Sequence, residues 1–178
     1  PGIMLWNLRQ LAGTLTLLCE TEPLIDALSR FEAHYQTALA RRMFARLGLL
    51  PSGDLAGDLE LSQKVFQWLT TSRASWPDFF FDVFCGRLSA RKSPNEQAYQ
   101  SPDFKTLLAA LSAHKADRPE RLAHAYFTSN RPVGLVIGEI EAIWSAIDAH
   151  DDWGPFEAAL DQIESARQGL GLTPSPVP

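Results

Sequence analysis

The 178-residue sequence carries 16 Lys and Arg against 21 Asp and Glu, a net charge of −5, and 46% of its residues are hydrophobic. This is the composition of a globular protein that can bury a core. The negative charge excludes a general attraction to nucleic acid or to an anionic membrane surface. No apolar run approaches the roughly 20 residues that a membrane span needs, and no cleavable leader is visible.

Helical spacing of hydrophobic residues dominates the first half of the chain. It predicts helices at residues 5–18, 21–48, 55–69 and 76–88. We expect Thr21 and Ser75 to act as N-caps and Gly48 to end the second helix. The apolar face of the first helix consists of leucines at spacings of three and four, namely Leu5, Leu8, Leu11, Leu15 and Leu18.

The polar stretch SARKSPNEQAYQSPD, which has two prolines, separates the halves, and its residues 89–101 are predicted to be a loop without regular structure. Beyond it the spacing predicts helices at residues 101–111, 117–127, 132–147 and 151–163, followed by a frayed tail at 169–178. We expect Asp117 and Asp151 to cap two of these helices. Gly134 and Gly138, four apart, are interpreted as a close-packing notch on one helix side. The predicted fold is therefore all-α, a single bundle-like domain of about eight helices over residues 1–178.

No recognisable catalytic, cofactor-binding or metal-binding motif appears in the sequence. The four histidines lack the spacing of a metal-binding helix, and they are His34, His114, His124 and His150. There is no nucleophile elbow and no phosphate-binding glycine loop. The acidic groups fit helix starts or solvated faces, and they are Asp54, Asp58, Glu60, Glu139 and Glu141.

Two further features have a structural and a functional interpretation. Cys19 and Cys85 are too few for a disulfide framework, so we expect buried free thiols and a cytoplasmic protein. Arg41, Arg42 and Arg46 lie in the last turns of the second predicted helix. They either complement the negative end of the helix dipole or anchor an acidic segment of a partner.

The opening PGIMLWNLRQLA resembles the selenoprotein O (YdiU-like) family, in which a Q-P-x-x-x-x-W-N-L-x-x-L-A motif follows the catalytic region. The residues in register are Pro1, Trp6, Asn7, Leu8, Leu11 and Ala12. Similar stretches follow at Phe31, Tyr35, Met43 and the Leu-Gly-Leu after it, at WPDFFFDVF, and at NRPVGLVIGEIEAIW. The chain departs from the family at Val136-Ile137-Gly138, where Leu-Arg-Asn is usual. It also ends in LTPSPVP without the Cys or selenocysteine of many relatives, so no redox role carries over.

The resemblance implies the C-terminal portion of a longer protein with a kinase-like (pseudokinase) fold. That family transfers AMP from ATP to hydroxyl side chains of proteins with the help of a divalent metal. Its catalytic residues lie upstream of the Trp-Asn-Leu motif, so the resemblance assigns no site residue and no cofactor to this chain, and ATP and Mg belong to the full-length protein. The expected partners are the upstream kinase-like domain, the protein substrates of the full-length enzyme, and another copy through an exposed first helix. We expect the isolated chain to be inactive. The alternative is a stand-alone helical domain that binds another protein.

Overall fold

A computed structural model describes residues 2–172, and the expected tail lies largely outside these residues. The described part confirms the all-α prediction, since its only β-type pairing is an isolated bridge between Leu49 and Ala116. The α-helices are α1 (Gly2–Leu15), α2 (Thr21–Ser29), α3 (Phe31–Leu47), α4 (Leu55–Ser72), α5 (Trp76–Asp82), α6 (Glu96–Tyr99), α7 (Pro102–Ser112), α8 (Ile137–His150) and α9 (Gly154–Gly169). Three 3-10 helices are η1 (Phe84–Gly86), η2 (Pro119–Ala123) and η3 (Ala125–Thr128).

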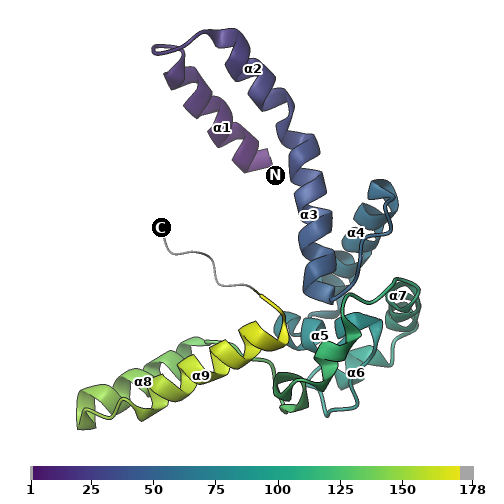
Figure 1. Cartoon of the computed structure of the whole chain (residues 1–178), viewed down its shortest axis with the longest axis vertical. Coiled ribbons are helices and arrows are strands. Elements are labelled where there is room, and N and C mark those ends of the chain that lie inside the picture. Colours follow the sequence, from purple (N-terminus) through teal and green to yellow (C-terminus); the bar gives the residue numbers. More distant parts are fainter. Residues whose placement is uncertain (1, 173–178) are drawn as a thin grey trace.

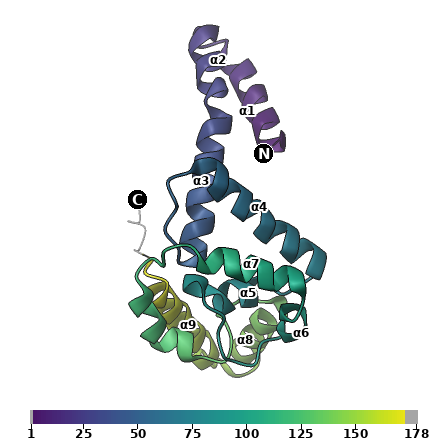
Figure 2. The same cartoon turned by 90° about the vertical axis from the view of Figure 1, so that its right-hand side faces the viewer.

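The helices form a compact centre from which two arms project (Figure 1). One arm consists of α1, α2 and the N-terminal half of α3, and the other is the hairpin of α8 and α9. Figure 2 shows α4 to α7 gathered around the lower end of α3, away from the tip of the first arm. The shape differs from the expected bundle-like array because each arm packs only on itself and on the centre at its base.

The hydrophobic core lies in the centre and is built around Trp68 of α4. Its ring lies 5.3 Å from that of Phe79, 6.0 Å from that of Tyr99 and 5.0 Å from that of Phe104, centroid to centroid. Aliphatic residues of α3, α4 and α7 complete this cluster, among them Leu47, Val65, Leu69, Leu107 and Leu111. The core therefore joins α3, α4, α5, α6 and α7 and leaves both arms outside.

The end of α3 is as predicted. Gly48 adopts φ 67°, and its amide donates to the carbonyl oxygens of Phe44 and Ala45. A Cβ at Gly48 would lie 2.8 Å from ring atoms of Phe84, so the position requires both a left-handed backbone and the absence of a side chain.

Two helix boundaries in the first half were predicted wrongly. The helix expected over 21–48 is interrupted at Arg30, where the hydroxyl of Ser29 donates to the carbonyl of Asp26 at 2.7 Å. Such back-bonding competes with the helical ladder and bends helices. The helix expected over 76–88 stops at Asp82, because Cys85 and Gly86 both adopt positive φ.

The predicted N-caps have mixed outcomes. Ser101, the first residue of the helix predicted at 101–111, accepts a hydrogen bond from the amide of Phe104 at 3.2 Å and caps α7. Thr21 is instead the first residue of α2, after Glu20. The Ser75 hydroxyl donates to the Asp78 carboxylate at 2.6 Å and caps no backbone amide.

In the second half, the helix expected over 117–127 is a pair of 3-10 turns. Asp117 is not their cap, because Arg118 with φ 52° precedes η2 and Asp117 pairs with Arg121 instead. Asp151 ends α8 at φ 50°, and it is Asp152 that accepts from the Gly154 amide at the start of α9.

The glycine notch expected at Gly134 and Gly138 is also wrong. Gly134 lies before α8, whose first residue is Ile137, so the two glycines are not on one helix. A Cβ built on either would meet no atom within 4 Å.

The loop expected at 89–101 is mostly irregular, and within it only α6 and Ser101, the N-cap of α7, belong to a helix or its cap. Among residues 2–172, no helix combines the length and hydrophobicity of a membrane span.

Candidate functional site

The first arm exposes much of the face that the sequence predicts to be apolar. Leu5, Leu8 and Leu15 are half-buried, whereas Leu11 and Leu18 are exposed, and α1 has no buried residue. A shallow apolar groove of about 340 Å³ opens between α1 and the helices beside it. Trp6 of the Trp-Asn-Leu motif is 59% exposed. The expectation of an exposed first helix is thus confirmed.

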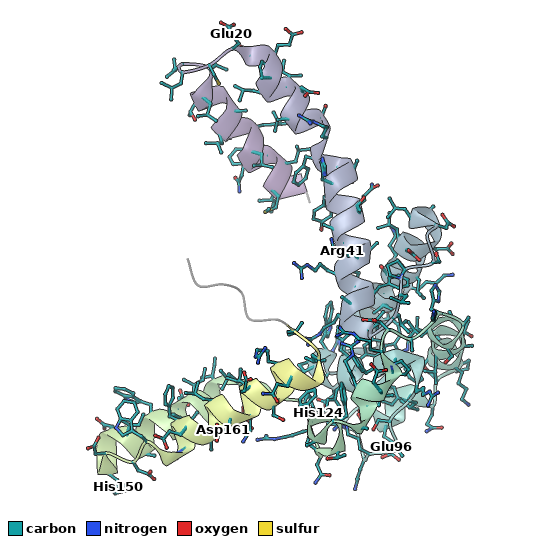
Figure 3. The ribbon with its side chains drawn as sticks, in the orientation of Figure 1. Glu20, Arg41, Glu96, His124, His150 and Asp161 are labelled. Atoms are coloured by element: carbon teal, nitrogen blue, oxygen red, sulfur yellow. The ribbon has the colours of Figure 1, made fainter. Side chains whose placement is uncertain are left out.

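The second arm exposes a comparable apolar surface. Its large exposed side chains are Ile137, Ile140, Trp144, Trp153, Phe156, Leu160 and Ile163. These residues supply the helical spacing predicted at 132–147 and 151–163, and Trp144 in particular is 64% exposed. Figure 3 shows His150 at the far end of this arm and Glu20 at the far end of the other. Both arms therefore present hydrophobic area that the rest of the described chain leaves uncovered, which marks interaction surfaces in soluble proteins.

A small cavity of about 280 Å³ lies at the base of the second arm. Its walls are mostly aromatic and aliphatic, with Phe80, Phe81 and Tyr126 on the side of the centre and Ile163 of α9 and Leu170 after it on the other, and Arg46 and Arg167 also line it. Burial raises the pKa of the Tyr126 hydroxyl, so this side chain stays neutral. The cavity offers an apolar seat without a catalytic group.

Arg41, Arg42 and Arg46 are exposed on α3, and none forms an ion pair with an acidic group of residues 2–172. Arg46 lies over the ring of Phe80 at 5.3 Å and borders the cavity. Figure 3 shows Arg41 pointing into the open space between the two arms. Arginines that lack a local acidic partner remain available to an anionic partner from outside.

The most elaborate polar cluster is buried in the centre, around Asp82 of α5 and Arg91 of the loop. Arg91 donates to Asp82 and to Asp78, each at 2.5 Å, and to the Asn130 carbonyl at 2.7 Å. Asp82 also accepts from Tyr99 at 2.8 Å and from the Ser93 hydroxyl. The acceptors around the guanidinium thus come from two parts of the chain, α5 and the distant Asn130.

This cluster has a structural role. Burial raises the pKa of the Tyr99 hydroxyl, which stays protonated and donates to Asp82. Burial by itself would lower the pKa of Arg91, but hydrogen bonds to Asp78 and Asp82 outweigh it and raise that pKa. The cluster holds the 89–101 segment and Asn130 against α5, and no described cavity opens onto Arg91. Two aspartates four apart on an aromatic helix were the signal that could have located it.

The histidines lie apart, as their spacing predicts. The ring of His114 packs edge-on against that of Phe44, 5.2 Å between centroids. His124 accepts from the amide of Tyr126 at 3.1 Å, and His34 borders the groove of the first arm. No group of three or more His, Cys, Asp or Glu in the described chain is arranged to hold a metal ion.

Both cysteines are free thiols, and only one is buried as predicted. Cys85 is buried, and burial raises the pKa of its thiol, so it is a poor nucleophile at neutral pH. Cys19 is exposed in the turn after α1.

Comparison with known proteins identifies the family. The family described as Protein adenylyltransferase SelO matches residues 1–164. The chain belongs to this family. The resemblance carried by the Trp-Asn-Leu motif is thereby confirmed.

Curated relatives agree with this assignment. The chain is 26% identical to the Protein nucleotidyltransferase YdiU of Gloeobacter violaceus over 92% of its own length and 35% of the relative's. It is 28% identical to the protein of that name from Synechocystis sp. over 93% and 37%. The protein from Chromohalobacter salexigens is 40% identical over 79 residues, 44% of the chain. The chain thus spans about a third of the length of the first two. No solved structure matches it.

Proposed function

We propose that the chain is a helical scaffold within a SelO-type protein adenylyltransferase and that catalysis takes place elsewhere in that enzyme. Two observations together support this proposal. The SelO family matches residues 1–164, and both arms expose apolar side chains that the described chain does not cover. In this proposal the longer protein transfers AMP from ATP to protein hydroxyls in the cytoplasm. Its kinase-like domain holds ATP and Mg, and no residue of this chain touches either.

The first arm is the surface on which the rest of the enzyme would pack. The Trp-Asn-Leu motif lies on α1, and the groove beside it is lined by Leu8, Leu15 and Leu28, among others. A tryptophan exposed here in the isolated chain would be covered in the longer protein. This surface would then hold the kinase-like domain at a fixed position relative to the α3–α7 centre.

Replacing Trp6 with Ala tests the docking directly. In the 178-residue chain the variant should cost less than about 1 kcal/mol, because the side chain is largely exposed. In the longer protein it should cost about 3–5 kcal/mol, the usual loss for a buried tryptophan, measured by urea unfolding. Trp6→Phe should keep more of the stability than Trp6→Ala. A small loss in both proteins would contradict docking at α1.

A stand-alone interaction domain is the second candidate. The observation that favours it is the set Arg41, Arg42 and Arg46, whose guanidinium groups lack an acidic partner in residues 2–172. An antibody raised against this chain distinguishes the two candidates on a blot of the native cell extract. A species close to three times the length of this chain supports the scaffold, and a species of 178 residues supports the separate domain.

A further inference from the structure

The α8–α9 hairpin carries a continuous row of apolar side chains, called here the seam. The two helices pack on each other, but no other part of the described chain covers the outer side of the seam. On α8 the seam residues are Ile137, Ile140, Trp144 and Ile147, and on α9 they are Trp153, Phe156, Leu160 and Ile163. Both sets follow the spacing three, four, three, and this alternation of three and four is the seven-residue pattern of helices in coiled coils and four-helix bundles. Seven of the eight, all but Ile147, are 39% or more exposed on the hairpin. The described chain supplies no second pair of helices to pack against this apolar surface.

Charge is also distributed unevenly along the hairpin, with acidic residues at its tip and arginines at its base. Residues 132–166 contain eight acidic side chains and no Lys or Arg. Four of the acids lie at or near the tip, and they are Asp148, Asp151, Asp152 and Glu157. At the base, Arg131 pairs with Glu139 and Arg167 with Glu164. Arg46 of α3 borders the cavity there, with Arg42 one turn further along α3, and neither forms an ion pair within residues 2–172.

The apolar seam and the separation of charge between tip and base indicate which partner fits the hairpin. Each of the eight seam residues is apolar, so the seam needs an apolar helical surface of the same length. The tip needs a cationic group at one end of that surface. A second copy of this hairpin in antiparallel orientation supplies both, because it places each acidic tip beside the other copy's Arg42 and Arg46. The 16 residues of α9 span about 24 Å at 1.5 Å per residue, and α8 is of similar length, so tip and base coincide.

We propose that two copies of the chain associate through their α8–α9 hairpins, which form an antiparallel four-helix bundle. Trp153 and Phe156 at the tip of one copy lie at the mouth of the 280 Å³ cavity of the other. The arrangement has two-fold symmetry, and each contact therefore occurs twice. This proposal places self-association on the second arm, whereas from the sequence we expect it at the first helix. It does not depend on any activity of the longer protein.

Sedimentation velocity of the 178-residue chain between about 5 and 200 µM is the first test. The proposal predicts a reversible monomer–dimer equilibrium that weakens as salt is raised, since the tip contacts are electrostatic. A monomer at every concentration would overturn it. Trp144→Glu should weaken the dimer by at least about a hundredfold, because it puts a charge in the apolar seam. Circular dichroism checks that this exposed substitution leaves the helices intact.

A charge exchange then tests the antiparallel orientation. One variant reverses the tip (Asp151→Arg with Asp152→Arg), and the other reverses the base (Arg42→Glu with Arg46→Glu). Each alone should weaken its own dimer by about tenfold or more, because like charges then meet at both ends. Mixed in equal amounts, the two should form a heterodimer with wild-type affinity, since both ends are again complementary.

Two controls separate this interface from other contacts. Lys105 lies exposed on α7 and forms no ion pair within the described residues, so Lys105→Glu should leave the dimer unchanged. Trp6→Ser on the first arm should do the same. A dimer that Trp6→Ser abolishes, or that neither charge variant weakens, would contradict the proposal. So would a mixture of the two charge variants that stays monomeric.

Discussion

Replacing Arg91 with Met should strongly destabilise the protein, because it breaks buried ion pairs in the centre. The Arg91 side chain is 9% exposed, and its guanidinium bonds two carboxylates, one of which belongs to Asp82, whose side chain is 1% exposed. Met keeps most of the apolar stem of the side chain and removes the charge. Asp82 would then be left as a buried carboxylate whose remaining donors are Tyr99 and the Ser93 hydroxyl.

The magnitude follows from the cost of breaking a buried ion pair from one side. Such changes cost about 3–5 kcal/mol, because the surviving charge stays desolvated without its partner. Loss of the contact between the Arg91 guanidinium and the ring of Phe81, at 5.0 Å, adds about 0.5–1 kcal/mol. Domains are stable by roughly 5–15 kcal/mol, so Arg91→Met should remove about a quarter or more of the total.

Urea unfolding followed by circular dichroism measures this loss. The matched control is Arg87→Met, at an exposed position outside the cluster, and it should change the free energy of unfolding by less than about 0.5 kcal/mol. Adding Asp82→Asn to Arg91→Met should recover part of the loss, since it removes the unpaired charge. If Arg91→Met costs less than about 1 kcal/mol, or if the double variant is as unstable as the sum of the singles, the cluster does not hold the loop as described.

Two more predictions concern local backbone and pH. Gly48→Ala should cost about 2 kcal/mol or more, because it combines a left-handed backbone with overpacking against Phe84; Gly138→Ala, which meets open space, should be neutral or stabilising by about 0.5 kcal/mol, and equal losses would contradict this. Glu164 accepts hydrogen bonds from Arg167, which lower its pKa from 4.5 to about 2. The stabilisation from this pair is therefore present above pH 4.5 and lost as the pH falls through about 2. A carboxyl NMR titration should show that midpoint, and Arg167→Gln should move it back toward 4.5; a midpoint that stays the same in the variant would exclude the pair as its cause.

The sequence predicted those parts of the fold that depend on local signals. Helix stops and starts at Gly48 and Ser101 follow from the conformational freedom of glycine and from a hydroxyl beside a proline. The apolar periodicity located the helices and the all-α class. Asp54 also begins α4, where its carboxylate accepts from the Ala56 amide at 3.1 Å, in line with the acidic helix start expected there.

What the sequence could not predict depends on tertiary contacts. The end of α5 at Asp82 is set by Cys85, a non-glycine residue at φ 60° that no local pattern indicates. Arg91 looked like one more charge in a polar loop, because its partners Asp78 and Asn130 are 13 and 39 residues away. Loop residues 89–101 are held by side chains, which leave no periodic signature.

The sequence located the apolar residues of the arms but not the surfaces that surround them. Periodicity identifies an apolar face and says nothing about whether this chain covers it. Leu11 and Trp144 follow the same spacing as buried core residues, and both are exposed. An inward prediction for such residues holds only when the partner surface belongs to the same chain.

The most direct test of the scaffold proposal is an AMP-transfer assay with labelled ATP and Mg. It compares the 178-residue chain with the longer protein in which it would be embedded, on the same mixture of protein acceptors. The proposal predicts label on protein hydroxyls with the longer protein and none with the chain alone. Transfer by the chain alone would contradict it, since catalytic residues would then have to lie within these 178 residues.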